Sequence, residues 1–299
     1  MNNVIYNQIR IFQSIAREGS ITAAARKLEI TPPSVSKALK LLEQHIGHPL
    51  FVRTTRHIEL TDAGQQLLQQ TQAAVASLEN ALEGIKDTHQ APSGLVRITL
   101  SRFAYLLILK PHMAEFCAQY PGIQLEVSVY DGTINIVDER YDLGIRFGDI
   151  LEGGVVARQL MAPFREGLYA SAAYLEEFGI PVTPADLSRH RLIGYRFITN
   201  NRILPLILEE NGEQLTLDMQ GQLISNDIDV MADGIRSGLG IGRLFEPVYQ
   251  LQSDKDRFIP VMESYWKTYP PVFLYYPKSA GKTKRVQSLI EFLILKNAR

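Results

Sequence analysis

Cysteine is almost absent from this 299-residue sequence, which contains only Cys117. One cysteine excludes an intrachain disulfide and a thiolate metal cluster, and it is typical of a reducing compartment, so we expect a cytoplasmic protein. Its neighbours Phe116 and Ala118 predict a buried side chain. Long apolar runs are missing as well, because no segment reaches the roughly 18 residues of a membrane-spanning helix. The residues after Met1 also lack the basic and apolar regions of a secretion signal, so we expect neither secretion nor membrane anchoring.

An excess of charge of one sign is also lacking, because 31 Lys and Arg stand against 32 Asp and Glu. This balance argues against a polybasic arm and against an acidic disordered chain. It is an average over unlike parts: residues 1–60 hold eight basic and four acidic side chains, a net charge of +4, and the other 239 residues carry −5. The length and a hydrophobic content of 45% suffice for two domains. A basic N-terminal part makes nucleic acid a candidate partner.

Three helices are predicted in the first sixty residues. Apolar residues at helical spacing from Ile5 to Ala16 predict the first, which ends at Gly19. Ser20 is a suitable N-cap for a short second helix, whose alanines let a neighbouring helix approach closely. The third helix begins with Thr31 as N-cap and Pro32 in the first helical position, where no N–H is needed.

The third helix has two chemically different faces. Its apolar face consists of Val35, Leu39, Leu42 and Ile46, and its polar face of Pro33, Ser36, Lys37 and Lys40. A short helix, a tight turn and a second helix with free hydroxyl and ammonium groups describe a helix-turn-helix that reads DNA. The alternative is a surface helix with solvated lysines.

A wing is predicted after the third helix, where Gly47 and Pro49 end it. Leu50–Arg53 and Ile58–Leu60 indicate two short strands around a basic turn. The candidate DNA-binding residues are Thr31, Pro32, Pro33, Ser34, Ser36, Lys37, Lys40, Arg53, Thr54 and Arg56. Together these elements predict a winged helix-turn-helix domain over residues 1–60.

This N-terminal region resembles the LysR-type transcriptional regulators. The resemblance is carried by Phe12, Gly19-Ser20, Ala23-Ala24-Ala25, Leu28, Thr31, Pro33, Val35-Ser36-Lys37, Leu42-Glu43, Gly47, Pro49-Leu50-Phe51, Arg53, Leu60-Thr61 and Ala63-Gly64. Glu29 stands where that family often has glycine, and Pro32 and Ala38 stand where it often has glutamine. We therefore expect Ser36 and Lys37 to make the direct base contacts, and the shape of the DNA to supply further recognition. A positive φ at Glu29 costs roughly 1 kcal/mol relative to glycine.

A long linker helix is predicted from Thr61 to about Lys86, within a linker of residues 61–89. Its apolar positions alternate in steps of three and four residues, which is the seam of a coiled coil. The candidate dimerisation residues on this seam are Leu68, Val75, Leu78, Leu82 and Ile85, and Thr71 also lies on the seam. The resemblance implies a homodimer and commonly a homotetramer. The alternative is that the helix packs along the chain's own second domain.

The rest of the chain alternates between strand and helix patterns. Strands at 95–100 and 124–129 flank a helix at 105–119, which predicts a parallel α/β sheet. Further predicted elements are strands at 142–146, 167–170 and 224–226, helices at 172–178 and 227–237, and a Gly-rich turn at 238–242.

This region is similar to the effector domain of the same family, which has the two-lobed fold of periplasmic solute-binding proteins. The matching segments are Gly94, Tyr120-Pro121-Gly122, Asp142–Arg146, Ala170–Leu175, Leu187, His190-Arg191, Ser225–Asp227 and Gly238–Ile241. The resemblance implies an effector-binding domain at 93–299, with one lobe at about 93–163 plus 267–299 and the other at about 164–266. The fold class is therefore α/β overall.

Small anions bind in such clefts at strand ends and helix N-termini. The candidate effector-binding residues are Ser101, Arg102, Thr133, Arg146, Phe197 and Asn226. Arg102 and Arg146 suit a fork around a carboxylate, although Arg146 has Asp142 and Asp149 as alternative partners. An anionic metabolite is the leading expectation, and an aromatic acid or no ligand at all stays open.

Signs of enzyme chemistry are weak. His45-x-x-His48 has no third metal ligand nearby in sequence, and Gly238-x-Gly240-x-Gly242 lacks the spacing of a phosphate loop. We therefore expect no metal, no cofactor and no enzymatic activity, and a double-stranded DNA-binding regulator controlled by a small molecule. The rival hypothesis is a stand-alone solute-binding or solute-transforming protein whose residues 1–60 serve only as an oligomerisation cap.

Overall fold

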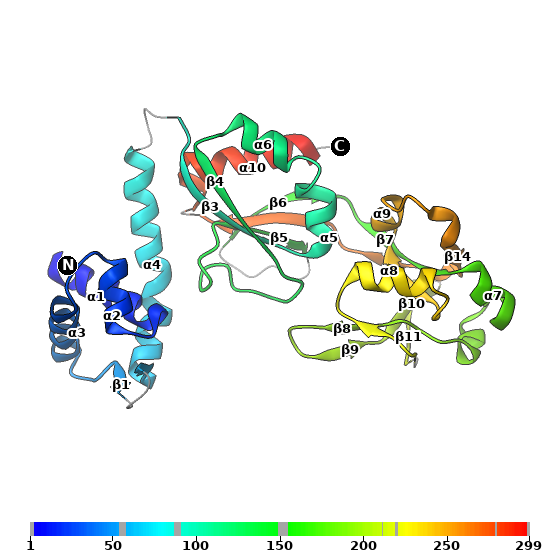
Figure 1. The fold of residues 1–299 in the computed structure, drawn as a ribbon, viewed down its shortest axis with the longest axis horizontal. Coiled ribbons are helices and arrows are strands. Elements are labelled where there is room, and N and C mark those ends of the chain that lie inside the picture. Colours follow the sequence, from blue (N-terminus) through cyan, green and yellow to red (C-terminus); the bar gives the residue numbers. More distant parts are fainter. Residues whose placement is uncertain are drawn as a thin grey trace. The chain divides into compact units, whose positions relative to one another are not determined.

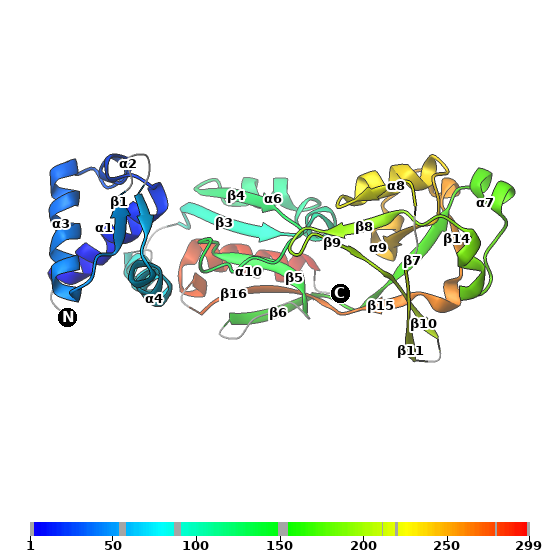
Figure 2. The same cartoon turned by 90° about the horizontal axis from the view of Figure 1, so that it is seen from below.

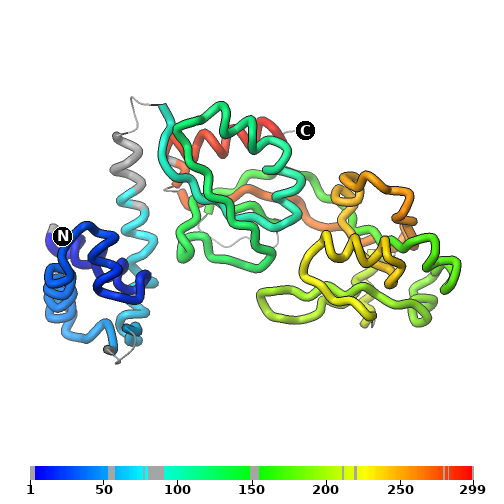
Figure 3. The backbone as a smooth tube through the Cα atoms, in the orientation of Figure 1, coloured from blue at the N-terminus to red at the C-terminus, as the bar shows by residue number. Residues whose placement is uncertain are grey.

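The computed structural model describes residues 3–53, 58–86, 91–148, 155–210, 212–218, 221–278 and 280–297. The chain divides into two compact units, Met1–Lys86 and Asp87–Arg299. The ribbon in Figure 1 and the backbone tube in Figure 3 show the path of the chain through each unit.

The N-terminal unit is a winged helix-turn-helix followed by a long helix (Figure 1). Its elements are α1 (Asn3–Glu18), α2 (Ile21–Lys27), α3 (Pro32–Ile46), β1 (Phe51–Arg53), β2 (Ile58–Leu60) and α4 (Asp62–Lys86). The predicted boundaries are confirmed by the caps: Ser20 Oγ accepts from Ala23 N at 3.4 Å, and Thr31 Oγ1 accepts from Ser34 N at 3.4 Å. Gly19 and Gly47 end α1 and α3 with positive φ.

The core of this unit forms where α1, α2 and α3 meet. Val35 and Leu39 turn the predicted apolar face of α3 into it, and both are buried. Ala24 and Ala25 of α2 are also buried, which lets the helices approach closely. Phe51 of the wing closes the core, with its ring 5.4 Å from that of Phe12. The wing is therefore anchored to the helices by apolar packing.

Helix α4 begins as predicted, with Thr61 Oγ1 accepting from Gly64 N at 3.0 Å. The first half of its apolar seam lies against its own unit, whereas the sequence predicted a partner helix along the whole seam. Leu68 packs against the N-terminal core, Thr71 Oγ1 accepts from Gln13 Nε2 at 3.1 Å, and Val75 is only 8% exposed. Val75 is thus covered within one chain, and Leu68 and Thr71 are partly covered.

The second half of the seam differs from the first. Leu78 is 42% exposed, and it is the one exposed seam residue among those whose side chains the structure describes. The side chains of Leu82 and Ile85 lie outside the described residues. Among the described seam residues, Leu78 is therefore the apolar side chain most accessible to a partner helix.

The first lobe of the C-terminal unit is built on a mixed sheet with the strand order β4-β3-β5-β16-β6. Its strands are β3 (Gly94–Leu100), β4 (Ile123–Val129), β5 (Leu143–Phe147), β6 (Val155–Met161) and β16 (Val272–Pro277). The predicted parallel pairing is confirmed for β3 with β4 and β5, but β16 runs antiparallel to both β5 and β6. Helices α6 (Met113–Gln119) and α10 (Lys284–Asn297) pack on this sheet (Figure 1).

The helix predicted at 105–119 is wrong in its start and its continuity. Helical structure begins with α5 (Arg102–Ala104), continues as a π-helical turn over Tyr105–Leu109, and resumes in α6. Pro111 lies in the break, because its ring nitrogen has no hydrogen to donate to the helix ladder. The prediction that Cys117 is buried is also wrong, since it is exposed. Phe116 takes the core position, and the next helical residue points about 100° away from it.

The second lobe contains two sheets and a hairpin. In one sheet, β13 (Gly242–Phe245), β14 (Ile259–Val261) and β15 (Lys267–Tyr269) all pair antiparallel with β7 (Phe164–Ala170). The other sheet has the order β12-β8-β9. The remaining elements are β8 (Gly194–Phe197), β9 (Arg202–Leu204), β10 (Leu206–Glu210), β11 (Glu213–Leu217), β12 (Ile224–Ser225), α7 (Ala172–Phe178), α8 (Ile228–Arg236) and α9 (Glu246–Gln250). Because β15 pairs with β7, this lobe extends past the predicted limit at residue 266.

The two lobes are joined by two passages of the chain that lie side by side. One runs from β6 to β7 and the other from β15 to β16, and Figures 2 and 3 show them together. The strand pairings explain this, since β6 pairs with β16 and β7 pairs with β15. The lobes are therefore connected through a narrow double strand.

The turn between α2 and α3 generates a testable prediction. Glu29 adopts a φ of 55°, which confirms the left-handed conformation considered for this position. Glu29→Gly should raise the free energy of unfolding by about 1 kcal/mol, because glycine has no Cβ to strain that conformation. Urea unfolding of the full-length protein measures the change.

The matched control is Gln44→Gly, at an exposed position within α3. It should lower stability by about 1 kcal/mol, since glycine is a poor helix former. Equal destabilisation of the protein by both variants would contradict the assignment of strain to Glu29.

Candidate functional site

The first candidate site is the exposed face of α3 in the N-terminal unit. Thr31, Pro32, Pro33 and Ser34 at its N-terminal end are exposed, as are Lys37 and Lys40, and Ser36 is half-buried. Hydroxyl groups cluster at this end, where Thr31 Oγ1 and Ser34 Oγ share a hydrogen bond of 2.9 Å. The predicted polar residues of α3 therefore share one accessible surface.

The electrostatics of this surface favour an anion. The first turn of α3 contains no acidic residue, so the partial positive charge of the helix N-terminus is not offset there. Within the described ranges, Lys37 and Lys40 form no ion pair with a carboxylate. The backbone of Arg53 lies in β1, whereas its side chain and the whole of Thr54 and Arg56 lie outside the described residues.

The second candidate site is a cavity between the two lobes of the C-terminal unit, with a volume of about 180 Å³. We call it the interlobe cavity. Its lining residues are Ser101, Phe103, Asp131, Arg146, Phe147, Glu166, Tyr195, Phe197, Leu204, Ile228, Met231, Arg243, Leu244, Phe245, Val248 and Tyr269. Three predicted effector residues line it, namely Ser101, Arg146 and Phe197. Most of the wall is aromatic or aliphatic, which suits a ligand with an apolar body.

Arg146 is the dominant charge on the first-lobe wall. It is 4% exposed, and its terminal nitrogens donate to Ile145 O at 2.9 Å and to Thr99 Oγ1 and Tyr130 O at 3.1 Å. Its Nε is buried and has no hydrogen-bond partner. Burial lowers the pKa of Arg146, but an arginine keeps its proton at neutral pH. Asp142, its alternative partner, instead accepts from Arg97 N at 2.8 Å, and none of the ion pairs found among the described residues involves Arg146. Asp149 lies outside the described residues.

Ser101 and Asp131 lie at the ends of the strands beside Arg146. Ser101 Oγ caps α5 by accepting from Ala104 N at 3.1 Å, and Asp131 Oδ1 accepts from Arg102 N at 2.9 Å. Burial raises the pKa of Asp131, against the opposing effects of that hydrogen bond and of the Arg146 charge. On the facing lobe, burial raises the pKa of the Tyr195 phenol to about 12.

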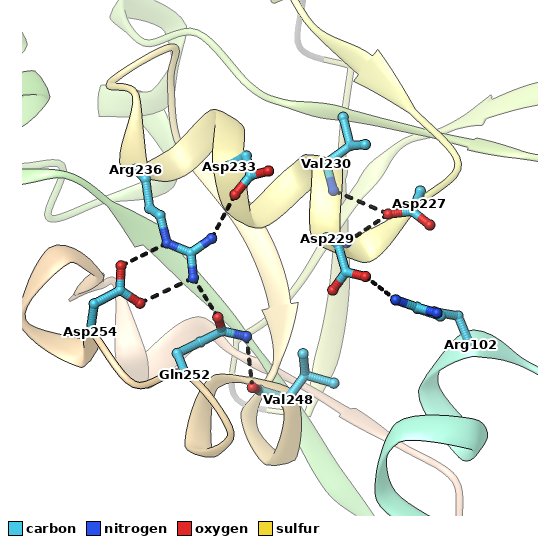
Figure 4. A network of polar contacts seen from close by, with 9 residues as sticks. All are labelled: Arg102, Asp227, Asp229, Val230, Asp233, Arg236, Val248, Gln252 and Asp254. Atoms are coloured by element: carbon cyan, nitrogen blue, oxygen red, sulfur yellow. Dashed lines mark hydrogen bonds and ion pairs between the residues drawn. The ribbon is translucent and has the colours of Figure 1, made fainter. Parts of the chain in front are cut away.

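The other three predicted effector residues do not line the cavity. The Arg102 guanidinium pairs with the Asp229 carboxylate of α8, as Figure 4 shows, so the predicted fork of Arg102 and Arg146 is wrong. Thr133 N donates to Thr199 Oγ1 at 2.7 Å, which is a second polar bridge between the lobes. Asn226 is exposed and immediately precedes Asp227, the N-cap of α8.

Helix α8 is held firmly in the second lobe. Figure 4 shows Asp227 Oδ1 capping its first turn, at 2.8 Å from Asp229 N. At the other end, the Arg236 guanidinium binds the Asp254 carboxylate at 2.8 and 3.0 Å and Gln252 Oε1 at 2.5 Å. Asp229 therefore meets Arg102 from a well-anchored helix.

Sequence reasoning missed two charged residues on the second-lobe wall. Arg243 on β13 is 6% exposed and donates to Leu204 O and Pro205 O, each at 2.9 Å. Glu166 on β7 is 8% exposed, and burial raises its pKa. Glu166 directly follows Arg165, and Arg243 is the second of the four residues of β13, so the local sequence marks neither as a buried charge.

An aromatic cluster completes the wall and draws on both lobes. The Phe103 ring lies 4.8 Å from Phe164 and 5.0 Å from Phe245, and the Phe245 ring lies 4.8 Å from Tyr269. Phe147, which follows Arg146, lies 5.6 Å from Phe245. Ring centroids at these separations pack favourably.

Candidate metal ligands do not cluster in the part of the chain that the structure describes. Within the described ranges, no group of three or more His, Cys, Asp or Glu side chains could hold a metal ion. His45 and His48 are exposed, and the glycines at 238–242 form the predicted turn from α8 into β13. No helix among the described residues is long and apolar enough to cross a membrane.

Comparisons with known proteins match both units. Residues 6–65 match the bacterial regulatory helix-turn-helix protein family of lysR type, and residues 89–296 match the LysR substrate binding domain. The HTH-type transcriptional regulator PgrR of Escherichia coli is 28% identical over 267 residues, covering 89% of each chain. PtxR of Pseudomonas aeruginosa, also an HTH-type transcriptional regulator, is 27% identical over 293 residues, covering 98% of this chain and 93% of its own.

Solved structures share the fold along nearly the whole chain. AphB, a virulence activator of Vibrio cholerae, has a TM-score of 0.63 at 20% identity, covering 97% of this chain and 99% of its own. CrgA of Neisseria meningitidis, a LysR-type transcriptional regulator, has a TM-score of 0.61 at 23% identity, covering 98% and 99%. The chain therefore belongs to the LysR family of transcriptional regulators, with a helix-turn-helix domain and a two-lobed substrate-binding domain.

Proposed function

We propose that this regulator binds a small organic anion with an apolar body in the interlobe cavity, and that the anion controls DNA binding. The observation that carries the proposal is Arg146, a buried guanidinium with an unpartnered Nε in a cavity of mostly apolar side chains. A carboxylate beside it would form charge-assisted hydrogen bonds where water is largely excluded. The aromatic cluster would contact the rest of the ligand.

The charge balance of the cavity supports an anion over a cation. Arg146 and Arg243 contribute two positive charges, and both are arginines, which keep their protons. Asp131 and Glu166 oppose them, but burial raises the pKa of each carboxyl and so favours its neutral form. A ligand carboxylate would offset one of the two positive charges.

Control follows from a shift between lobe arrangements. Arg102 with Asp229 and Thr133 with Thr199 bridge the lobes, so a ligand in the cavity biases which arrangement is populated. Moving a two-state equilibrium from 1:99 to 99:1 needs about 5.5 kcal/mol of differential binding. One anion contact and a set of apolar contacts, each made in one arrangement only, are of that order.

DNA binding is assigned to α3 and the wing. We propose that Ser36 and Lys37 reach base edges or phosphates, that Thr31, Pro32, Pro33, Ser34 and Lys40 contact the backbone, and that Arg53, Thr54 and Arg56 follow it from the wing. We also propose a homodimer formed through α4, extending to a homotetramer, because two copies present two reading helices to a two-fold site. A cytoplasmic location follows from this role.

The first prediction from the proposed function concerns Lys37. Lys37→Ala should reduce the magnitude of the slope of log affinity against log salt by about one for each phosphate that the variant no longer neutralises, because fewer counterions are released. Fluorescence anisotropy over a salt series measures the slope, on DNA from upstream of the protein's own coding region.

Lys110→Ala, at an exposed position in the C-terminal unit, removes the same charge and should leave the slope unchanged. Unchanged slopes for both Lys37→Ala and Lys40→Ala would count against α3 as the DNA-reading surface.

The second prediction concerns Arg146. Among small organic acids that raise the melting temperature of the full-length protein, Arg146→Gln should weaken binding by about 10–100-fold, the value of a charge-assisted hydrogen bond. Arg146→Lys keeps the positive charge but loses the planar guanidinium with its paired N–H donors, so it should weaken binding to an intermediate degree.

Arg158→Gln, an exposed arginine on β6, serves as the control and should bind the same acids normally. Equal affinities in Arg146→Gln and the unmodified protein would refute the role of Arg146 in binding the carboxylate.

The third prediction concerns the linker helix. Leu78→Asp should yield monomers, because it places a charge on the exposed apolar position of the seam. Gln69→Asp lies nine residues earlier, on the opposite side of α4, and should leave the oligomer intact. Size-exclusion chromatography with light scattering gives the molar mass, and an unchanged mass for Leu78→Asp would contradict dimerisation through this seam.

A further inference from the structure

The second-lobe wall of the interlobe cavity contains a carboxyl group that has no part in the proposed binding of a carboxylate by Arg146. Glu166 lies on β7 in the middle of its sheet, with Phe245 of β13 opposite it on one side and Lys267 of β15 on the other. It is more than nine-tenths buried and lines the cavity. A buried acceptor in such a place needs a hydrogen-bond partner.

The protein itself offers the Glu166 carboxyl group few hydrogen-bond donors. Its one hydrogen bond among the described residues comes from the Tyr269 hydroxyl at 3.5 Å, the outer limit for such a bond. The neighbouring Arg243 directs its terminal nitrogens to the carbonyls of Leu204 and Pro205. In the described part of the chain, no lysine or arginine is within ion-pairing distance of Glu166. Acceptor capacity therefore remains for a ligand.

We propose that Glu166 is a specificity-determining residue that accepts a hydrogen bond from a neutral donor on the effector, so that the effector is a hydroxylated organic acid. The inference rests on the proposed function, because Arg146 takes the carboxylate of the same molecule. A carboxyl oxygen accepts a hydrogen bond in either protonation state. The hydroxyl contact therefore does not depend on the charge of Glu166.

The surroundings of Glu166 select a neutral donor over an ammonium group. Arg243 on β13 and Lys267 on β15 face it with positive charge, and Tyr269 contributes a hydroxyl. These charges act to lower the pKa of Glu166, although burial raises it by more. The same positive potential repels an ammonium ion and leaves a hydroxyl unaffected.

The two recognition points belong to different lobes. Arg146 lies on β5 of the first lobe and Glu166 on β7 of the second, with aromatic rings from both lobes in the same cavity. A ligand that engages both residues therefore holds the lobes together, whereas a simple acid engages one. The hydroxyl group is thus tied to the regulatory response as well as to affinity.

The test uses matched pairs of acids with the full-length protein. The probes are benzoate, phenylacetate and 3-phenylpropionate, each with its ring-hydroxylated counterparts and its aminomethyl counterpart, and calorimetry gives the affinities. We expect a hydroxylated member to bind about 10-fold more tightly than its parent, and the ammonium member to bind more weakly than the hydroxylated one. Glu166→Leu should abolish the preference, Glu166→Gln should keep part of it through its carbonyl oxygen, and the exposed Glu176→Leu should keep all of it.

The outcomes separate the two hypotheses. No binding by any acid, or equal binding by Arg146→Gln, overturns the proposed function and this inference with it. Binding that depends on Arg146 but ignores the hydroxyl, or that favours the ammonium member, overturns the inference alone. A hydroxyl preference that persists in Glu166→Leu also overturns it, and the measurement on the unmodified protein decides the matter if that variant does not fold.

Discussion

The C-terminal unit depends on the double passage of the chain between its lobes. One strand leaves the first sheet after β6 and the other returns to it at β16, and the two are neighbours in both lobes. A pair of adjacent extended strands resists separation. At its second-lobe end the rings of Phe164 and Tyr269 stack 6.3 Å apart, and both pack against Phe245. The interlobe cavity is lined by residues of both lobes, and Val248 of the second lobe also packs into the core of the first. Each lobe keeps its own strand pairing, and the lobes meet through this connection and the packing around it.

Sequence patterns predicted the N-terminal unit closely, because its boundaries are set locally. Ser20 and Thr31 cap the helices that follow them, and Gly47 ends α3, with no help from distant residues. The strain at Glu29 could be foreseen for the same reason. The strands β3, β4 and β5 of the first lobe were also predicted, but β6 and the antiparallel insertion of β16 were not. That strand follows β5 by more than a hundred residues, and no local pattern records such a pairing.

The candidate effector site was predicted only in part, because a cavity is made by residues from many elements. Arg146 was identified from its place near a strand end, whereas Arg102 has the same local signature and pairs with Asp229 instead. Glu166 and Arg243 lie in strands whose burial became evident only in three dimensions. The seam of α4 illustrates the converse case. Its heptad pattern is real, yet part of the surface is covered by α1 of the same chain, and periodicity alone cannot name the partner.

The ion pair between Arg102 and Asp229 has a consequence for how the lobes respond to their surroundings. Both side chains are partly exposed, so dissolved salt screens their attraction, which in such a setting is worth roughly 0.2–1 kcal/mol. The apolar packing around the cavity is hardly screened at all. Among the contacts that join the two lobes, the ion pair therefore weakens as the ionic strength of the medium rises, whereas the apolar packing keeps its strength.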